Sequence, residues 1–94
     1  MEQFHQKQNS LVLYRRRMGL SQKRVAQLLG HRDTSMISHY EHGRALPPLA
    51  MALRLEIVYR VPVAFLFPTM YDALKRQIRE HEGSLAGTGQ QSLF

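Results

Sequence analysis

The sequence predicts an all-helical fold, a compact bundle of about five short helices followed by a sixth, C-terminal helix. From Ser10 to about His81, no stretch of strand length alternates apolar and polar residues. Prolines occur only at positions 47, 48, 62 and 68, and together with glycines they divide this span into helix-length segments. The chain of 94 residues has the size of one domain and can bury one modest core.

Each of the first three helices is predicted by a polar residue that can cap its N-terminus and a glycine that ends it. Glycine suits the C-terminal position because it adopts the left-handed backbone conformation without strain. The segments, with their caps and glycines, are 11–17 (Ser10, Gly19), 22–29 (Ser21, Gly30) and a helix capped by Asp33 or Thr34 that runs through His42 to Gly43.

Prolines delimit the later helices. The pair at 47–48 suits the first turn of a helix over 49–59, where a missing N–H costs nothing. That helix is apolar on most sides, so we expect it to be the most buried. Pro62 opens a short helix that ends at Leu66, and Pro68 interrupts the chain again.

The last helix is predicted over 70–82, with Tyr71, Leu74 and Ile78 on one stripe. Beyond it the chain holds Gly, Ser, Thr and Gln with almost nothing to pack. The expected organisation is a flexible lead-in over 1–9, a helical domain over 10–67, a C-terminal helix over 68–82 and a disordered tail over 83–94.

The composition excludes several classes of protein. Lys and Arg number 13 against 7 Asp and Glu, which gives a formal charge of +6 and a pI near 10.3. Ten of these cations are Arg, whose planar guanidinium favours forked contacts to phosphate or carboxylate. Without cysteine there is no disulfide, zinc finger or cysteine nucleophile. No apolar run reaches the roughly 20 residues of a membrane span, and we expect a basic cytoplasmic protein that does not associate with membranes.

The stretch from Leu20 to Arg44 predicts two short helices joined by a turn that contains glycine. Ala26 is small where the second helix must cross the third closely, and Ile37 and Tyr40, one turn apart, face the core. The other face of the third helix is polar, small or adaptable. Such a helix suits the major groove of DNA, which is just wide enough to admit it. The same spacing also fits an ordinary helical hairpin in a bundle.

Eleven residues of this stretch and two beyond it stand at positions that recur in one family of helical domains: Leu20, Ser21, Gln22, Val25, Ala26, Leu29, Gly30, Ile37, Ser38, Glu41 and Gly43, then Pro47 and Val61. With them, residues 11–67 resemble the Cro/repressor-type helix-turn-helix family. The resemblance implies a lambda-repressor-like fold. It also implies a sequence-specific transcriptional regulator of repressor type, which places the helix over about 34–42 in the major groove of double-stranded DNA.

Two features depart from the family pattern. The turn over 30–37 is one residue longer than usual, so the start of the recognition helix can shift by one position. Glu56 stands where the family usually carries a small apolar residue. Either the helix over 49–59 is rotated slightly or this carboxylate pairs with a cation such as Arg60, four residues on.

The resemblance also implies roles for individual side chains. Those expected to read bases are Thr34, Ser35, Met36 and His39. Hydroxyls and imidazole can hydrogen-bond to base edges and a thioether can press on a thymine methyl, although Thr34 and Ser35 can instead cap the helix. The side chains expected at phosphates are Gln22, Lys23, Arg32 and Arg44. Arg15 and Glu41 would form a structural ion pair between the first and third helices.

A homodimer is the expected assembly. Its twofold contact would come from Phe65, Phe67, Tyr71, Leu74 and Ile78, with packing of these residues on their own domain as the alternative. The dimer would prefer an inverted repeat with half-site centres about 34 Å apart. The alternative function is a protein-interaction module, such as an antitoxin or adaptor, that uses the stripe of Tyr71, Leu74 and Ile78.

The sequence contains no convincing catalytic, metal or cofactor site. His39 and His42 lie on one helix face but lack a third ligand. Ser, His and Asp occur without a nucleophile elbow or a glycine loop that could hold phosphate. We therefore expect no enzyme, no cofactor and no small-molecule ligand.

Overall fold

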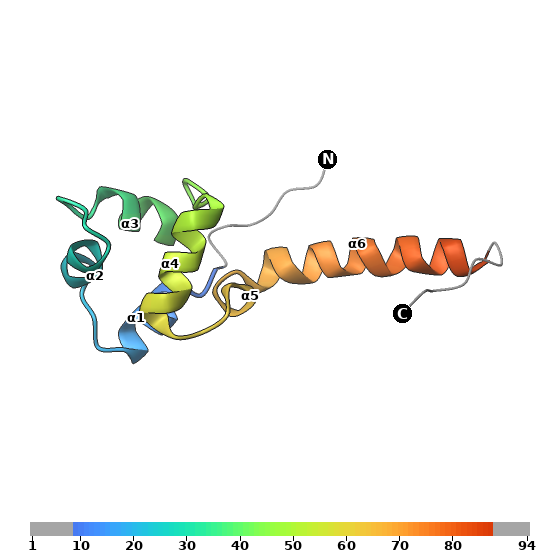
Figure 1. Ribbon diagram of the computed structural model, residues 1–94, viewed down its shortest axis with the longest axis horizontal. Coiled ribbons are helices and arrows are strands. Elements are labelled where there is room, and N and C mark those ends of the chain that lie inside the picture. The colour runs from blue at the N-terminus through green and yellow to red at the C-terminus, as the bar shows by residue number, and fades with distance from the viewer. Residues whose placement is uncertain (1–8, 88–94) are drawn as a thin grey trace.

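The computed structural model describes residues 9–87, and all regular structure in that range is helical. Five short helices form a bundle and the sixth runs away from it (Figure 1). In chain order the helices are α1 (Leu11–Arg17), α2 (Gln22–Leu28), α3 (Ser35–Glu41), α4 (Leu49–Tyr59), α5 (Val63–Leu66) and α6 (Pro68–Gly87). The predicted all-helical fold class is confirmed.

The core of the bundle draws on each of α1 to α5. Its largest side chains with no more than 2% exposure are Leu11, Val25, Ile37, Leu55 and Leu66. Burying a side chain of this size contributes about 1.5–3 kcal/mol. Ala26 and Tyr40, both predicted to face inward, are also buried. The core therefore fixes the orientation of the short helices, which are too short to be stable alone.

Helix α4 is buried on one face and exposed on the other. Met51 and Leu55 lie in the core, but Leu49, Leu53 and Ile57 are 76%, 46% and 73% exposed. Because these three residues recur every four positions, they form a second apolar face on the opposite side of the helix. The core covers one face only. With Met51, Ala52, Leu55 and Tyr59 buried, α4 still contributes more buried residues than any other described helix, as expected.

The N-terminus of α1 is held by Asn9. Its Oδ1 accepts a hydrogen bond from the Leu11 N–H at 3.0 Å, and its Nδ2 donates to the Tyr40 carbonyl at 2.9 Å. Ser10, the predicted cap, makes no capping side-chain bond, and its backbone N–H donates to the Leu66 carbonyl at 2.8 Å. The predicted flexible lead-in is thus wrong for Asn9, and its other residues lie outside the described part of the chain.

The first three helices end in the same turn, built around the predicted glycines. At Gly30, φ is +78°, and the next residue, His31, donates its N–H to the Ala26 carbonyl at 2.8 Å. The equivalent bonds close α1 and α3. Each turn satisfies carbonyls that the helix end leaves open.

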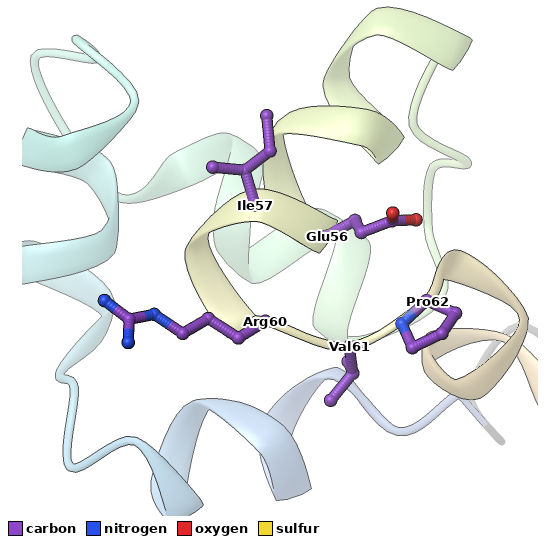
Figure 2. A pocket seen from close by; sticks show the side chains of 5 residues that line it. All are labelled: Glu56, Ile57, Arg60, Val61 and Pro62. Atoms are coloured by element: carbon purple, nitrogen blue, oxygen red, sulfur yellow. The ribbon is translucent and has the colours of Figure 1, made fainter.

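Helix α4 ends differently, at a residue other than glycine. Arg60 has φ 61° and ψ 37°, in the left-handed region. Glu56 Oε1 accepts a hydrogen bond from the Val63 N–H at 3.0 Å, at the first turn of α5. The suggested pairing of Glu56 with Arg60 is not what the structure has, and the two side chains leave α4 in different directions (Figure 2). A surface pocket of about 270 Å³ is lined here by Glu56, Ile57, Arg60, Val61 and Pro62.

Helix α6 is longer than predicted at both ends. Pro68 is its first residue, a position where proline lacks no needed hydrogen bond, rather than an interruption. The helix continues through 83–87, residues that were expected to belong to a disordered tail. That part of the prediction is wrong, because a helix already formed extends at little cost through Ser84 and Leu85. Residues 88–94 lie outside the described range.

Replacing Arg60 with glycine should give a free energy of unfolding about 1 kcal/mol higher than replacing it with alanine. Both variants lose the same exposed side chain, but only glycine adopts a φ of 61° without a Cβ clash. Urea denaturation followed by far-UV circular dichroism compares them. Equal midpoints would show that this position carries no backbone strain.

Candidate nucleic-acid interface

Helices α2 and α3 lie at the end of the bundle opposite α6 (Figure 1). They pack through Val25 and Ala26 of α2 and Ile37 and Tyr40 of α3, all at most 4% exposed. The side chain of Ala26 is a single methyl group, which allows the two backbones to approach closely. The buried faces of both helices are therefore defined by packing.

The turn before α3 places the start of this helix. The Asp33 carboxylate accepts a hydrogen bond from the Ser35 N–H at 2.9 Å, and this bond lowers the pKa of Asp33 below its usual value. Thr34 occupies the N-cap position but makes no capping side-chain bond. Of the two residues predicted to cap α3, Asp33 makes the capping side-chain bond, and the helix begins at Ser35. At the preceding helix, the predicted cap Ser21 accepts from the backbone of α2.

The outward face of α3 carries the four predicted base-reading residues. Ser35 and Met36 are exposed, whereas Thr34 and His39 are half-buried. Positions 35, 36 and 39 share one side of a helix, and Thr34 adjoins them at its start. The interior of the protein does not cover this face, so a ligand can reach all four side chains.

A buried carboxylate fixes the C-terminal end of α3. The Glu41 side chain is 3% exposed, and its two oxygens accept bonds from Arg15 Nε at 2.6 Å and Arg15 Nη2 at 3.2 Å. Arg15 Nη1 also donates to the Leu20 carbonyl at 3.0 Å, just before α2. The bond to Glu41 raises the pKa of Arg15. This ion pair, implied by the family resemblance, joins α1 to α3.

Gln22 belongs to the same cluster. Its Nε2 donates to Glu41 Oε1 at 2.8 Å, so its amide nitrogen braces α3 from the first turn of α2. Its role at phosphate remains a prediction. Sequence reasoning missed two members of this framework, Asn9 and the Leu20 carbonyl. Their contacts join positions far apart in sequence or use backbone atoms, and no local pattern indicates them.

Three of the side chains predicted at phosphates are cations on α2 and on the segments that precede and follow α3. Lys23 lies in the first turn of α2, Arg32 in the turn before α3 and Arg44 just after α3, and all three are exposed. Another exposed cation, Arg17, has its guanidinium carbon 5.3 Å from the centre of the Tyr14 ring. The basic side chains predicted at phosphates are therefore accessible.

The predicted dimer contact needs one correction. Phe67 is 7% exposed and belongs to the core cluster of the bundle, so it cannot face a second molecule. Phe65, Tyr71, Leu74 and Ile78 are between 45% and 55% exposed. The stripe on α6 is therefore not covered by intramolecular packing, the alternative that the sequence left open.

Comparison with known families decides the class of the protein. A family model described as helix-turn-helix matches residues 11–66, more than half of the chain. The chain belongs to the Cro/C1-type helix-turn-helix family. It is therefore a DNA-binding regulator of that type, and DNA is its partner. No match was found among curated proteins or among solved structures.

Within residues 9–87 this helix-turn-helix protein shows no group of three His, Cys, Asp or Glu that could hold a metal ion. His42 Nδ1 lies 2.8 Å from the Ser38 carbonyl of its own helix. None of the helices described has the length and apolarity to cross a bilayer. The helix-turn-helix is a DNA-binding regulatory domain, a class that is typically not enzymatic.

Removing Arg15 alone, as Arg15→Met, should lower the free energy of unfolding by about 3–5 kcal/mol, because it leaves the Glu41 carboxylate buried without its cation. The double variant Arg15→Met/Glu41→Leu should lose less than the sum of its single variants. Chemical denaturation of the unchanged protein, the two single variants and the double variant gives the coupling free energy between Arg15 and Glu41. Strict additivity would mean that the two groups do not stabilise each other.

Tyr59 makes stability depend on pH in the alkaline range. It is 2% exposed, and burial together with the nearby negative charge of Glu41 raises its pKa to about 12. The unfolded chain ionises first, near a pKa of about 10, so the unfolding free energy should fall between about pH 10 and about pH 12, by up to about 3 kcal/mol. Tyr59→Phe should show a smaller decrease over this interval. The exposed Tyr71→Phe is the control and should behave as the unchanged protein does.

Proposed function

We propose that the protein is a sequence-specific transcriptional regulator of repressor type that inserts α3 into the major groove of double-stranded DNA. The observation that carries this proposal is the division of α3 into two faces. Ile37, Tyr40 and Glu41 are buried and hydrogen-bonded or packed on the inside, while Ser35 and Met36 are exposed on the outside. A rigid helix with an accessible polar face is what direct readout of base edges requires.

The chemistry of the outward side chains suits this role. The hydroxyls of Thr34 and Ser35 can donate or accept, and the Thr34 side chain is not used to cap the helix. Met36 can contact a thymine methyl, and the His39 ring offers a donor and an acceptor. Each good base contact of this kind contributes about 1–3 kcal/mol of discrimination.

Phosphate contacts would set the position of α3 in the groove. Lys23 in α2, Arg32 before α3 and Arg44 after α3 are exposed, and Gln22 lies at the start of α2. With the Gln22 Nε2 donating to Glu41, its contact to phosphate would use a remaining amide hydrogen. About four such contacts per subunit correspond to a slope near −3.6 in a double-logarithmic plot of affinity against salt.

We further propose a homodimer that reads an inverted repeat in the cytoplasm, through the exposed residues Phe65, Tyr71, Leu74 and Ile78. Twofold symmetry in the protein calls for twofold symmetry in the operator, with half-sites separated by whole turns of DNA. Selection of bound sites from a random duplex library reports sequence, symmetry and spacing together.

A second candidate function is an adaptor or antitoxin that holds another protein on the α6 stripe. The exposure of Tyr71, Leu74 and Ile78 favours it, since surface stripes of this kind are typical of interaction sites. Salt dependence separates the candidates. A DNA-binding protein loses affinity for duplex DNA steeply as salt rises, and an adaptor that does not use DNA shows no such response.

His39→Ala and Arg44→Ala should affect DNA binding in different ways. His39→Ala should relax the preference at one base pair by about 1–3 kcal/mol, whereas Arg44→Ala should weaken specific and random DNA alike and reduce the salt slope by about 1. Arg54→Ala, which removes an exposed Arg of α4, is the matched control and should change neither. Fluorescence anisotropy with selected and scrambled duplexes measures both effects. If both variants weaken binding to all DNA sequences equally, the proposed register of α3 on the bases is wrong.

A further inference from the structure

The apolar side chains of α6 form a regular seam. Tyr71, Ile78 and Leu85 are seven residues apart, and Leu74 and His81 share the second position of the same repeat. The four apolar members are between 45% and 58% exposed. Alternate spacings of three and four are those of a two-stranded coiled coil. Figure 1 shows α6 running away from the bundle, which leaves its length accessible to a second helix.

The positions that flank the seam are charged on one side and uncharged on the other. Lys75 follows Leu74, and Glu82 follows His81, one repeat later. On the other side of the seam, Gln77 and Ser84 are uncharged. Residues at such flanking positions set the orientation and register of paired helices.

We propose that α6 pairs antiparallel with α6 of a second copy of this chain, with Leu74 opposite the partner's Leu85 and Ile78 opposite the partner's His81. The proposal rests on the homodimer of the proposed function and revises its contact: Leu74 and Ile78 remain in the seam, His81 and Leu85 join it, and Phe65 and Tyr71 lie outside the paired layers. Twofold symmetry repeats each contact, so the seam has four layers. His81 supplies its polar position, a device that favours one register over others.

Charge complementarity favours this register. Equivalent flanking positions face each other in an antiparallel pair, which brings Lys75 beside the partner's Glu82 twice and Gln77 beside the partner's Ser84 twice. Within its own helix, Glu82 lies 3.4 Å from Arg79, and both side chains are about 60% exposed. This long contact leaves the carboxylate able to bridge Arg79 and the partner's Lys75.

Other arrangements lose these contacts. Moving the partner by one repeat toward the bundle sets Lys75 against the partner's Lys75 and brings the partner's Gly87 opposite Phe65, inside the globular domain. Moving it the other way sets Glu82 against the partner's Glu82. In a parallel pair, Lys75 faces Met70 and Glu82 faces Gln77 of the other chain, so no ion pair forms. In the proposed register, the partner's Gly87 reaches Asp72 and stops short of the domain.

The pairing determines how far apart the DNA-binding domains lie. In this register the two Pro68 residues are 23 positions apart along the helix pair, or about 35 Å at 1.5 Å per residue. A globular domain extends outward from each end. The recognition helices are then separated by more than one DNA turn of about 34 Å, so the half-sites should lie two or more turns apart rather than one.

Charge reversal tests the pairing in the absence of DNA. Lys75→Glu and Glu82→Lys should each weaken self-association about tenfold, because each creates two like-charged contacts. An equimolar mixture of the two variants, and the double swap Lys75→Glu/Glu82→Lys, should both recover it. Arg76→Glu, the same charge change on the far side of the helix, should have little effect. Sedimentation equilibrium over a concentration series measures all of these, and failure of the mixture and of the double swap to recover association would overturn the proposal.

Cysteine cross-linking tests the orientation, since the natural chain has no cysteine. A mixture of Leu74→Cys and Leu85→Cys proteins should form a mixed disulfide under mild oxidation, and each variant alone should not. The reason is that a disulfide needs Cα atoms within about 7 Å. Efficient cross-linking of Leu74→Cys to itself would establish a parallel pair and overturn the proposed one.

These experiments distinguish failure of the helix pairing from failure of the proposed DNA-binding function. A chain that stays monomeric, yet binds duplex DNA with a steep salt dependence, would remove the helix pairing and leave the DNA-binding role intact. A chain that shows the predicted charge-swap pattern, yet does not bind DNA, would support the pairing and remove the DNA-binding role.

Discussion

The buried carboxylate of Glu41 is the constraint on which the arrangement of the DNA-binding region depends. A carboxylate that is 3% exposed needs a cation and several donors, because burial without them is very costly. Arg15 supplies the charge from α1 and Gln22 a further donor from α2. Rotating or shifting α3 would break these bonds together, so its orientation relative to both other helices is strongly specified.

This constraint acts at the C-terminal end of α3, where Asn9 also binds the Tyr40 carbonyl. At the opposite end, Asp33 caps the helix from the preceding turn. The bonds that hold α3 in place therefore come from its inner side and its two ends. None of them uses Met36 or His39, so these side chains can adapt to a ligand while the backbone beneath them stays fixed.

Local signals explain how much of the fold was predictable. Gly19, Gly30 and Gly43 end helices through backbone conformations that depend on a few neighbouring residues, so the boundaries of α1 to α3 follow from sequence. The prediction for Phe67 failed because of a tertiary contact: Phe67 looks as suitable for a dimer as Phe65 until the path of the chain into the core is known.

The candidate site shows the same division. The periodicity of α3 predicts which face is buried, since Ile37 and Tyr40 lie one turn apart. The Arg15–Glu41 pair spans 26 positions and came from the family resemblance, because no local pattern marks it. The partner of Glu56 could not be predicted, because it is the backbone N–H of Val63 and any residue other than proline provides one. What each outward side chain does on DNA depends on the operator, which the protein sequence does not contain.

In the proposed binding mode, a short recognition helix with few phosphate contacts would have a limited affinity by itself, and pairing through α6 would compensate for this. The first turn of α6 still packs Met70 against the core, whereas Tyr71, Leu74, Ile78 and Leu85 farther along the helix are exposed. In the proposed dimer, a second domain tethered through α6 would bind at a high effective concentration once the first is on DNA, which would raise affinity without any new base contact. That gain in affinity requires the spacing of the half-sites on DNA to match the separation of the two domains that the helix pair sets. The length of α6 and the placement of Lys75 and Glu82 along it would therefore select among operators as directly as the side chains of α3 do.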